Sequence, residues 1–183
     1  MRGFGGGALG GRGEKFVIQA HLCTTWKDGQ YERTRDIVEV RAGFEDLLAR
    51  LGTDYIDVGM IHYVDSLEDW NGVVEGPVME YARRLKAAGR IKAIGMSSHN
   101  PETAMAAAKS GLVDVIMFSV NPCYDLQPAG EDCEQPWNGE TYEKPLANMA
   151  PQRDAPSEHC QSAGVPITVL TPSPGDHLLD RPL

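Results

Sequence analysis

The chain has 183 residues and a formal net charge of -9 at pH 7, with 42% hydrophobic residues. This length suffices for one domain with a hydrophobic core. The acidic balance, without any basic stripe, argues against a nucleic-acid backbone as a partner. No apolar run approaches the ~20 residues of a membrane-spanning helix. We therefore expect neither nucleic-acid nor membrane partners, and a cytoplasmic location.

The first residues are rich in glycine, and Gly3, Gly5 and Ala8 fit the GxGxxA pattern of dinucleotide-binding turns. That pattern binds a pyrophosphate only where a strand enters the turn and a helix leaves it. Because no strand precedes residue 3, we expect residues 1–13 to form a flexible lead rather than a nucleotide site.

The cysteines show no spacing typical of zinc or iron–sulfur ligands. We therefore expect buried or inert thiols and no metal site built from them. The four positions are Cys23, Cys123, Cys133 and Cys160.

Amphipathic and apolar segments alternate along most of the chain. Apolar residues recur at every third or fourth position from Ile37 to Leu51, which predicts a helix, and Gly52 predicts its end. Nearly all-apolar strands between helices favour an α/β fold, with a parallel sheet covered by helices. The expected strands cover residues 16–22, 55–61, 91–97, 113–120 and 166–171, and the expected helices cover 37–51, 78–88, 101–110 and 151–164.

Two segments between these elements are expected to be loops. Residues 24–36, TTWKDGQYERTRD, are rich in polar turn formers. Residues 122–150 are rich in proline, glycine and acidic side chains, and they are too long for an ordinary connection in a compact domain. With no separate linker apparent, we expect residues 1–183 to form a single domain.

Three segments in order, LGTDYIDVGMIHYVD, LKAAGRIKAIGMSSHNP and VDVIMFSVNP, resemble the aldo-keto reductase family from about Glu14 to Leu179. The resemblance implies a (β/α)8 barrel that transfers hydride between NADPH and an aldehyde or ketone. DGQYERTRD and SSHNP resemble a branch that often carries a C-terminal ferredoxin-like extension, whose cysteine cluster this chain lacks. Five expected strands, where such barrels have eight, predict a partial TIM-type barrel that is truncated at both ends.

The resemblance also implies roles for individual residues. His62 matches the active-site histidine that orients and polarises the substrate carbonyl, and His21 stands where the family has its catalytic lysine. Ser97 and Ser98 match the serine–asparagine pair that holds the nicotinamide carboxamide. Met117 falls where a glutamine normally assists this pair.

The family's catalytic tyrosine and its supporting aspartate lie upstream of the first expected strand, and nothing before Lys15 supplies them. Tyr55 lies inside a strand and is not a candidate for this acid. We therefore expect an impaired reductase. The alternative from the same fold is a catalytically inactive reductase fragment that acts as a binding or assembly module. Its open sheet edges would favour self-association.

A second alternative comes from the histidines. His21, His62 and His99 each follow a predicted parallel strand, at the end where barrel active sites gather, and Asp65 is nearby. Three imidazoles could bind zinc, so a metal-dependent barrel hydrolase is a rival interpretation.

Overall fold

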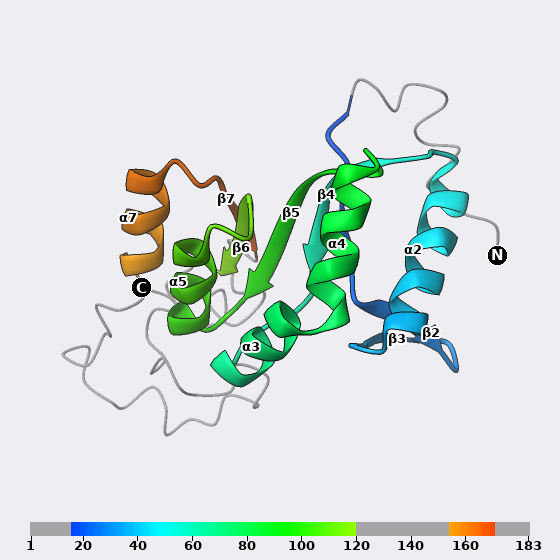
Figure 1. The fold of residues 1–183 in the computed structure, drawn as a ribbon, viewed down its shortest axis with the longest axis horizontal. Helices are drawn as coiled ribbons and strands as arrows, with labels where there is room; N and C mark the ends of the chain where they lie inside the picture. The colour runs from blue at the N-terminus through cyan, green and yellow to red at the C-terminus, as the bar shows by residue number, and fades with distance from the viewer. Residues whose placement is uncertain (1–15, 120–153, 171–183) are drawn as a thin grey trace, which may run out of the picture.

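The computed structural model describes residues 16–119 and 154–170. Within them, five parallel strands form one sheet in the order β1–β4–β5–β6–β7 (Figure 1). This sheet confirms the α/β class and the five expected strands. Their bounds are β1 Gln19–Leu22, β4 Ile56–Ile61, β5 Ile91–Ser98, β6 Val115–Ser119 and β7 Ile167–Leu170.

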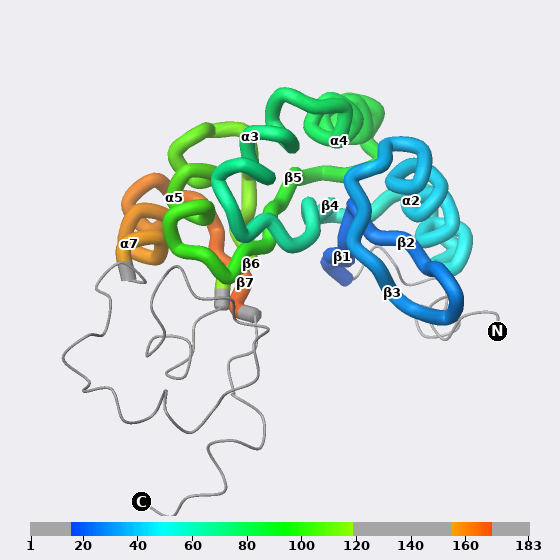
Figure 2. The backbone as a smooth tube through the Cα atoms, turned by 90° about the horizontal axis from the view of Figure 1, so that it is seen from below, coloured from blue at the N-terminus to red at the C-terminus, as the bar shows by residue number. Residues whose placement is uncertain are grey.

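The sheet curves into an arc, and the helices lie along its outer, convex side (Figure 2). This arrangement is that of a partial barrel, with β1 and β7 at the two edges of the sheet. In the described ranges, no helix combines the length and the apolar character that crossing a bilayer requires. The helices are α2 Ile37–Leu51, α3 Leu67–Glu75, α4 Pro77–Ala87, α5 Pro101–Ser110 and α7 Asp154–Ala163.

The ends of the helices follow from local sequence. Asp36 caps α2 by accepting hydrogen bonds from the amides of the first turn, and Gly52 ends it in the left-handed conformation, with φ of 66°. Asn100 caps α5 in the same way. The predicted helix stop at Gly52 is thus confirmed.

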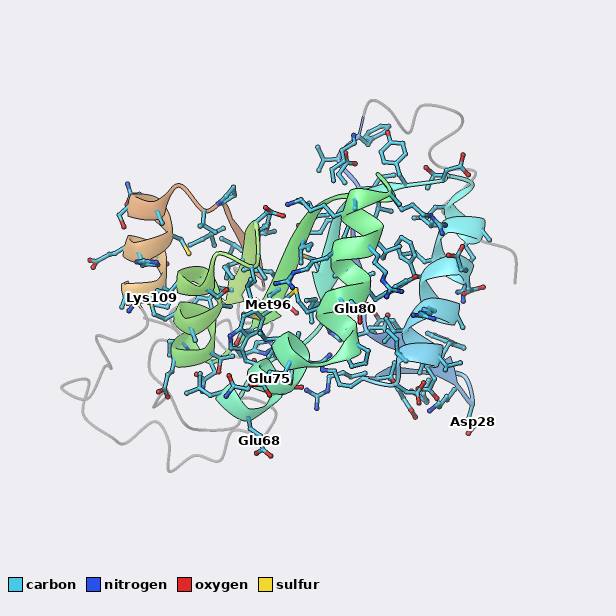
Figure 3. All side chains as sticks on the ribbon, viewed as in Figure 1. Asp28, Glu68, Glu75, Glu80, Met96 and Lys109 are labelled. Atoms are coloured by element: carbon cyan, nitrogen blue, oxygen red, sulfur yellow. The ribbon has the colours of Figure 1, made fainter. Side chains whose placement is uncertain are left out.

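The core lies mainly between the sheet and its helices, where Phe44 and Met79 are among the largest fully buried side chains. Met96 of β5 belongs to this layer, and Figure 3 shows its position on the sheet. A smaller apolar cluster of Val58, Met60 and Met117 is separate from it. Alternating side chains of the strands therefore build two apolar layers, as a covered parallel sheet requires.

Three predictions about element bounds were wrong. The expected loop 24–36 contains a hairpin of β2 (Thr24–Lys27) and β3 (Gln30–Arg33). Its turn residues Asp28 and Gly29 both have positive φ, as a two-residue hairpin turn demands. Figure 3 places Asp28 at the outer tip of this hairpin.

The other two corrections concern β1 and α3. The first strand begins at Gln19 rather than at residue 16, because its pairing with β4 starts there; Phe16 and Val17 are exposed. Helix α3 lies between the expected strand 55–61 and the expected helix 78–88, where no helix was predicted, and Ser66 caps it. The expected glycine-rich lead, the long loop over 122–150, Cys123 and Cys133 lie outside the described residues.

Candidate active site at the carboxyl ends of the strands

The centre of the site is a pair of stacked histidines. His21 lies in β1, and His62 follows the last residue of β4. Because these parallel strands are neighbours, with His21 opposite Met60, the two imidazoles meet. Their ring centroids are 4.2 Å apart and their planes differ by 30°. The two residues predicted to be catalytic therefore lie together at the end of the sheet where barrel enzymes place their chemistry.

His62 has unused hydrogen-bonding capacity. Its Nδ1 is the one buried side-chain polar atom without a partner among the described residues. Burial, followed by the charges of His21 and Arg35, lowers the pKa of His62 from 6.5 to about 4. The ring is therefore neutral near pH 7. The unpartnered Nδ1 is itself buried, so the ring carries an unsatisfied polar atom of the kind that is enriched at functional sites.

Tyr31 on the hairpin joins this pair. Its hydroxyl lies 3.2 Å from Nδ1 of His21, and its ring centroid lies 5.9 Å from that of His62. Burial lowers the pKa of His21, so this ring too favours its neutral form. Tyr31 was not predicted as a site residue, because the polar segment around it was expected to be a loop. The Asp28-Gly29 dipeptide, a strong signal for a hairpin, could have revealed its position.

Two arginines hold the backbone directly after β4. Arg35 donates from Nη1 to the carbonyl oxygen of His62 at 2.9 Å, and from Nη2 to that of Tyr63 at 3.0 Å. Arg33 donates to the same Tyr63 oxygen at 2.8 Å. Asp69 of α3 accepts from Nε and Nη2 of Arg35 at 2.9 and 2.7 Å, which orients the guanidinium. This arrangement, the Arg35–Asp69 clamp, fixes the peptide that presents His62.

Tyr63 occupies the left-handed region, with φ of 53°. This conformation is uncommon for a residue with a side chain, and it persists where the surroundings hold it in place. Here the Ser97 hydroxyl accepts a hydrogen bond from the Tyr63 amide at 2.8 Å, while the arginines hold its carbonyl oxygen. The turn thus directs the chain from His62 toward Asp65.

Asp65 binds the tip of β5. Its Oδ1 accepts from Ser98 Oγ at 3.0 Å and from the His99 amide at 2.6 Å, and its Oδ2 lies 2.9 Å from His99 Nδ1. Burial opposes ionisation of Asp65, but the hydrogen bonds from His99 and Ser98 outweigh it and lower the pKa of the carboxyl. The cluster therefore fastens the β4 tip to the β5 tip.

An open cavity of ≈ 320 Å³ lies between the hairpin and α2, and its lining includes His21 but not His62. Tyr31, His21 and Trp26 contribute to its lining. This cavity gives solvent or a small molecule access to the hydroxyl of Tyr31 and to the ring of His21.

Comparison with known proteins decides the family. The model of the aldo/keto reductase family matches residues 6–130. The chain belongs to the aldo/keto reductase family. Aldo-keto reductase YhdN of Bacillus subtilis (strain 168) is 30% identical over 92 residues, which cover 50% of this chain and 26% of YhdN. The chain thus spans about a quarter of the length of this curated relative.

Solved structures agree with the fold of this aldo/keto reductase family member. The holo form of AKR11C1 from Bacillus halodurans has a TM-score of 0.67 at 22% identity, and the match covers 98% of this chain and 51% of that one. An aldo/keto reductase from Klebsiella pneumoniae, in complex with NADP and acetate, has a TM-score of 0.50 at 19% identity, over 91% of this chain and 46% of that one. The predicted family and partial barrel are confirmed.

The residues of this family member that were predicted to bind the cofactor differ in how far their hydrogen-bonding groups are already used. Ser97 and Met117 are neighbours in the register of β5 and β6. Ser97 accepts from Tyr63, so its own proton can still be donated. Ser98 is fully buried and bonded to Asp65 and Asn100, so binding a cofactor would require it to exchange these bonds. For all three residues, cofactor binding stays a prediction.

The three histidines of the metal alternative do not form a triad in this family member. His21 stacks on His62, whereas His99 pairs with Asp65. Across residues 16–119 and 154–170, no group of three or more His, Cys, Asp or Glu side chains could hold a metal ion. The geometry therefore gives no support to a metal-dependent hydrolase.

Proposed function

We propose that the protein transfers hydride between NADPH and an aldehyde or ketone, with His62 donating a hydrogen bond to the carbonyl oxygen. The observation that carries this proposal is the placement of His62 in a member of the aldo/keto reductase family. The ring is neutral, partly buried and has an unpartnered nitrogen at the carboxyl end of β4. A donor held in such a site stabilises the negative charge that develops on the oxygen during reduction.

The described residues fit one part of a nicotinamide. Ser97 retains a hydroxyl proton that can be donated to the carboxamide oxygen, and Met117 beside it offers an apolar surface and a weak acceptor. NADPH, when bound, supplies the hydride to the carbonyl carbon. The complex of the Klebsiella pneumoniae relative with NADP and acetate supports this choice of cofactor.

The Arg35–Asp69 clamp positions His62 within this mechanism. Because the guanidinium of Arg35 bonds the carbonyl oxygens of His62 and Tyr63, it restricts the backbone that carries the imidazole. Positioned groups of this kind contribute to catalysis because the reacting atoms are already oriented before the reaction. The expected impairment of the enzyme stays a prediction, since it rests on residues outside the described part of the chain.

A fluorescence titration of the purified protein with NADPH, followed by an aldehyde, tests the proposal. We expect saturable binding and consumption of NADPH. His62→Asn should lower kcat by about 100-fold, the typical loss on removal of one oxyanion donor, while binding of NADPH persists. His159→Asn on α7 is the matched control and should retain wild-type kinetics.

The result of this titration distinguishes a working reductase from an inactive binding or assembly module. Binding of NADPH without turnover of any carbonyl compound would favour the inactive binding or assembly module. A folded protein that does not bind NADPH would overturn the cofactor assignment. Self-association through the edges β1 and β7 remains a separate prediction, and sedimentation as a monodisperse monomer would contradict it.

A further inference from the structure

We propose that Tyr31 is the proton donor of this site and that its proton reaches the substrate oxygen through His21. The proposal rests on the proposed function, because it assigns the acid of the same reaction. Tyr31 lies in the hairpin, which contains none of the residues predicted from the sequence to be catalytic.

The geometry connects the three side chains in series. The Tyr31 hydroxyl is within hydrogen-bond distance of Nδ1 of His21, at 3.2 Å. The ring of His21 also stacks on the ring of His62, with the two centroids 4.2 Å apart. A carbonyl oxygen that accepts a hydrogen bond from His62 is thereby placed beside the imidazole of His21.

The hairpin holds Tyr31 in this position. Tyr31 is paired with Trp26 in the register of β2 and β3, and their rings meet edge to face at 6.3 Å. The base of the hairpin is closed by the hydrogen bond from the Thr34 amide to the Cys23 carbonyl oxygen, at 2.9 Å. Such fixed pairing keeps the hydroxyl close to His21 without a bound substrate.

The protonation of His21 sets the direction of transfer. Its ring is half-buried, and a neutral imidazole has one donor and one acceptor nitrogen. In the proposed relay the phenol of Tyr31 donates to Nδ1 across this contact, which assigns the ring proton of neutral His21 to Nε2. Within the described residues, Nε2 makes no hydrogen bond, and it can therefore donate to a substrate.

The step balances in atoms and charge. As the carbonyl carbon gains a hydride from NADPH, its oxygen becomes an alkoxide and takes the proton from Nε2 of His21. Nδ1 then takes the proton of Tyr31, which leaves a phenolate. Tyr31 is 52% exposed and lines the open cavity, so water restores its proton. The net change is one carbonyl, one NADPH and one proton converted to an alcohol and NADP.

The first test needs no cofactor. Long-range proton–nitrogen NMR of the histidine rings distinguishes a protonated ring nitrogen from an unprotonated one. We expect His21 in the free protein to carry its proton on Nε2, and Tyr31→Phe to move part of the population to Nδ1. Tyr55→Phe, a matched change at the opposite end of β4, should leave His21 unchanged. A wild-type His21 protonated on Nδ1 would overturn the relay.

The second test is kinetic. Tyr31→Phe should lower kcat by about 100-fold, the lower range for a positioned general acid, with KM within about twofold of wild type. In a His21→Asn background, Tyr31→Phe should cause no further loss, because residues in one relay are not additive. Tyr55→Phe should keep the wild-type kcat.

Failure of the relay and failure of the proposed function differ in these experiments. Turnover that Tyr31→Phe leaves intact overturns the role of Tyr31 alone. Absence of turnover in the wild-type protein with bound NADPH overturns the proposed function, and with it the catalytic role of Tyr31.

Discussion

Thr168 on β7 donates a hydrogen bond from Oγ1 to Oε1 of Gln19 on β1, at 3.3 Å, although the two residues are 149 positions apart. They lie on the two edge strands of the five-stranded sheet. The sheet therefore curves strongly enough for side chains of its first and last strands to meet. This contact links the two edges of the partial barrel.

Loss of the Thr168–Gln19 contact should weaken the fold. We expect Thr168→Val to lower the free energy of unfolding by about 1 kcal/mol, as for a typical hydrogen bond. Urea unfolding of Thr168→Val, of Gln19→Ala and of the double variant gives the coupling free energy between the two side chains. Strictly additive effects would show that the contact does not contribute.

The Arg35–Asp69 clamp should contribute more to the free energy of unfolding than an exposed ion pair does. Arg35→Met removes two hydrogen bonds to carbonyl oxygens and leaves the partly buried Asp69 with Arg33 as its remaining cation, so we expect a loss of about 2 kcal/mol. Arg35→Lys retains the charge but cannot form the same set of bonds, and it should recover only part of the loss. Denaturant unfolding measures both.

The matched control for this clamp is Arg84→Met. Arg84 pairs with Glu80 on the exposed surface of α4, where both side chains are more than half exposed. Such pairs typically contribute about 0–1 kcal/mol. A loss at Arg84 as large as that at Arg35 would contradict the importance of the carbonyl contacts.

The low pKa of His62 predicts a pH dependence of stability. The histidine titrates near 6.5 in an unfolded chain and near 4 in the folded protein. Between these values the unfolded chain binds more protons, so stability is complete above about pH 6.5 and falls as the pH decreases toward 4. After allowance for solvent screening, the expected loss is about 2 kcal/mol.

His62→Asn should reduce the dependence of stability on pH between about pH 6.5 and 4. His21, whose pKa is also lowered by burial, contributes in the same direction and will leave a residual slope. Unfolding measured at pH 7 and pH 4.5 for both proteins separates the two contributions. Equal slopes for wild type and His62→Asn would contradict the shifted pKa.

Gly95 of β5 provides space for Met60 of β4. A methyl group at Gly95 would fall on the sulfur of Met60 and lie 3.1 Å from Val58 Cγ1. We expect Gly95→Ala to cost about 1–3 kcal/mol, as overpacking does. The cost should shrink in a Met60→Ala background, because the obstructing side chain is then absent.

Gly72 in α3 is the opposite case and the control. An added methyl group there has no neighbour within 4 Å. Gly72→Ala should therefore stabilise the helix by up to about 1 kcal/mol. Thermal or urea unfolding of both variants decides whether packing at Gly95, rather than the substitution of a glycine itself, causes the loss.

Much of the fold was predictable from sequence because its signals are local. The spacing of Val40, Phe44 and Leu48 defines the buried face of α2, and Gly52 supplies its left-handed end. The hairpin was missed because its strands are short and largely exposed, so their side chains show no apolar alternation.

The candidate site was only partly predictable. The sequence placed His21 and His62 at strand ends, and the parallel sheet brings them together as such positions imply. It could not show that Tyr31 reaches His21, since that contact depends on how the hairpin folds over β1. The motif predicted that Ser98 binds the cofactor. It could not show that the Ser98 hydroxyl is already hydrogen-bonded to Asp65 and Asn100.

The sequence by itself determined the family, the alternation of strands with helices and the residues at the strand tips. These depend on periodicity, capping and motif order, which act over a few neighbouring residues. The tertiary structure alone decided the stacking of the two histidines, the reach of Arg35 to the peptide after β4 and the contact between Thr168 and Gln19. Those contacts depend on strand register and sheet curvature, which arise only when distant segments pack.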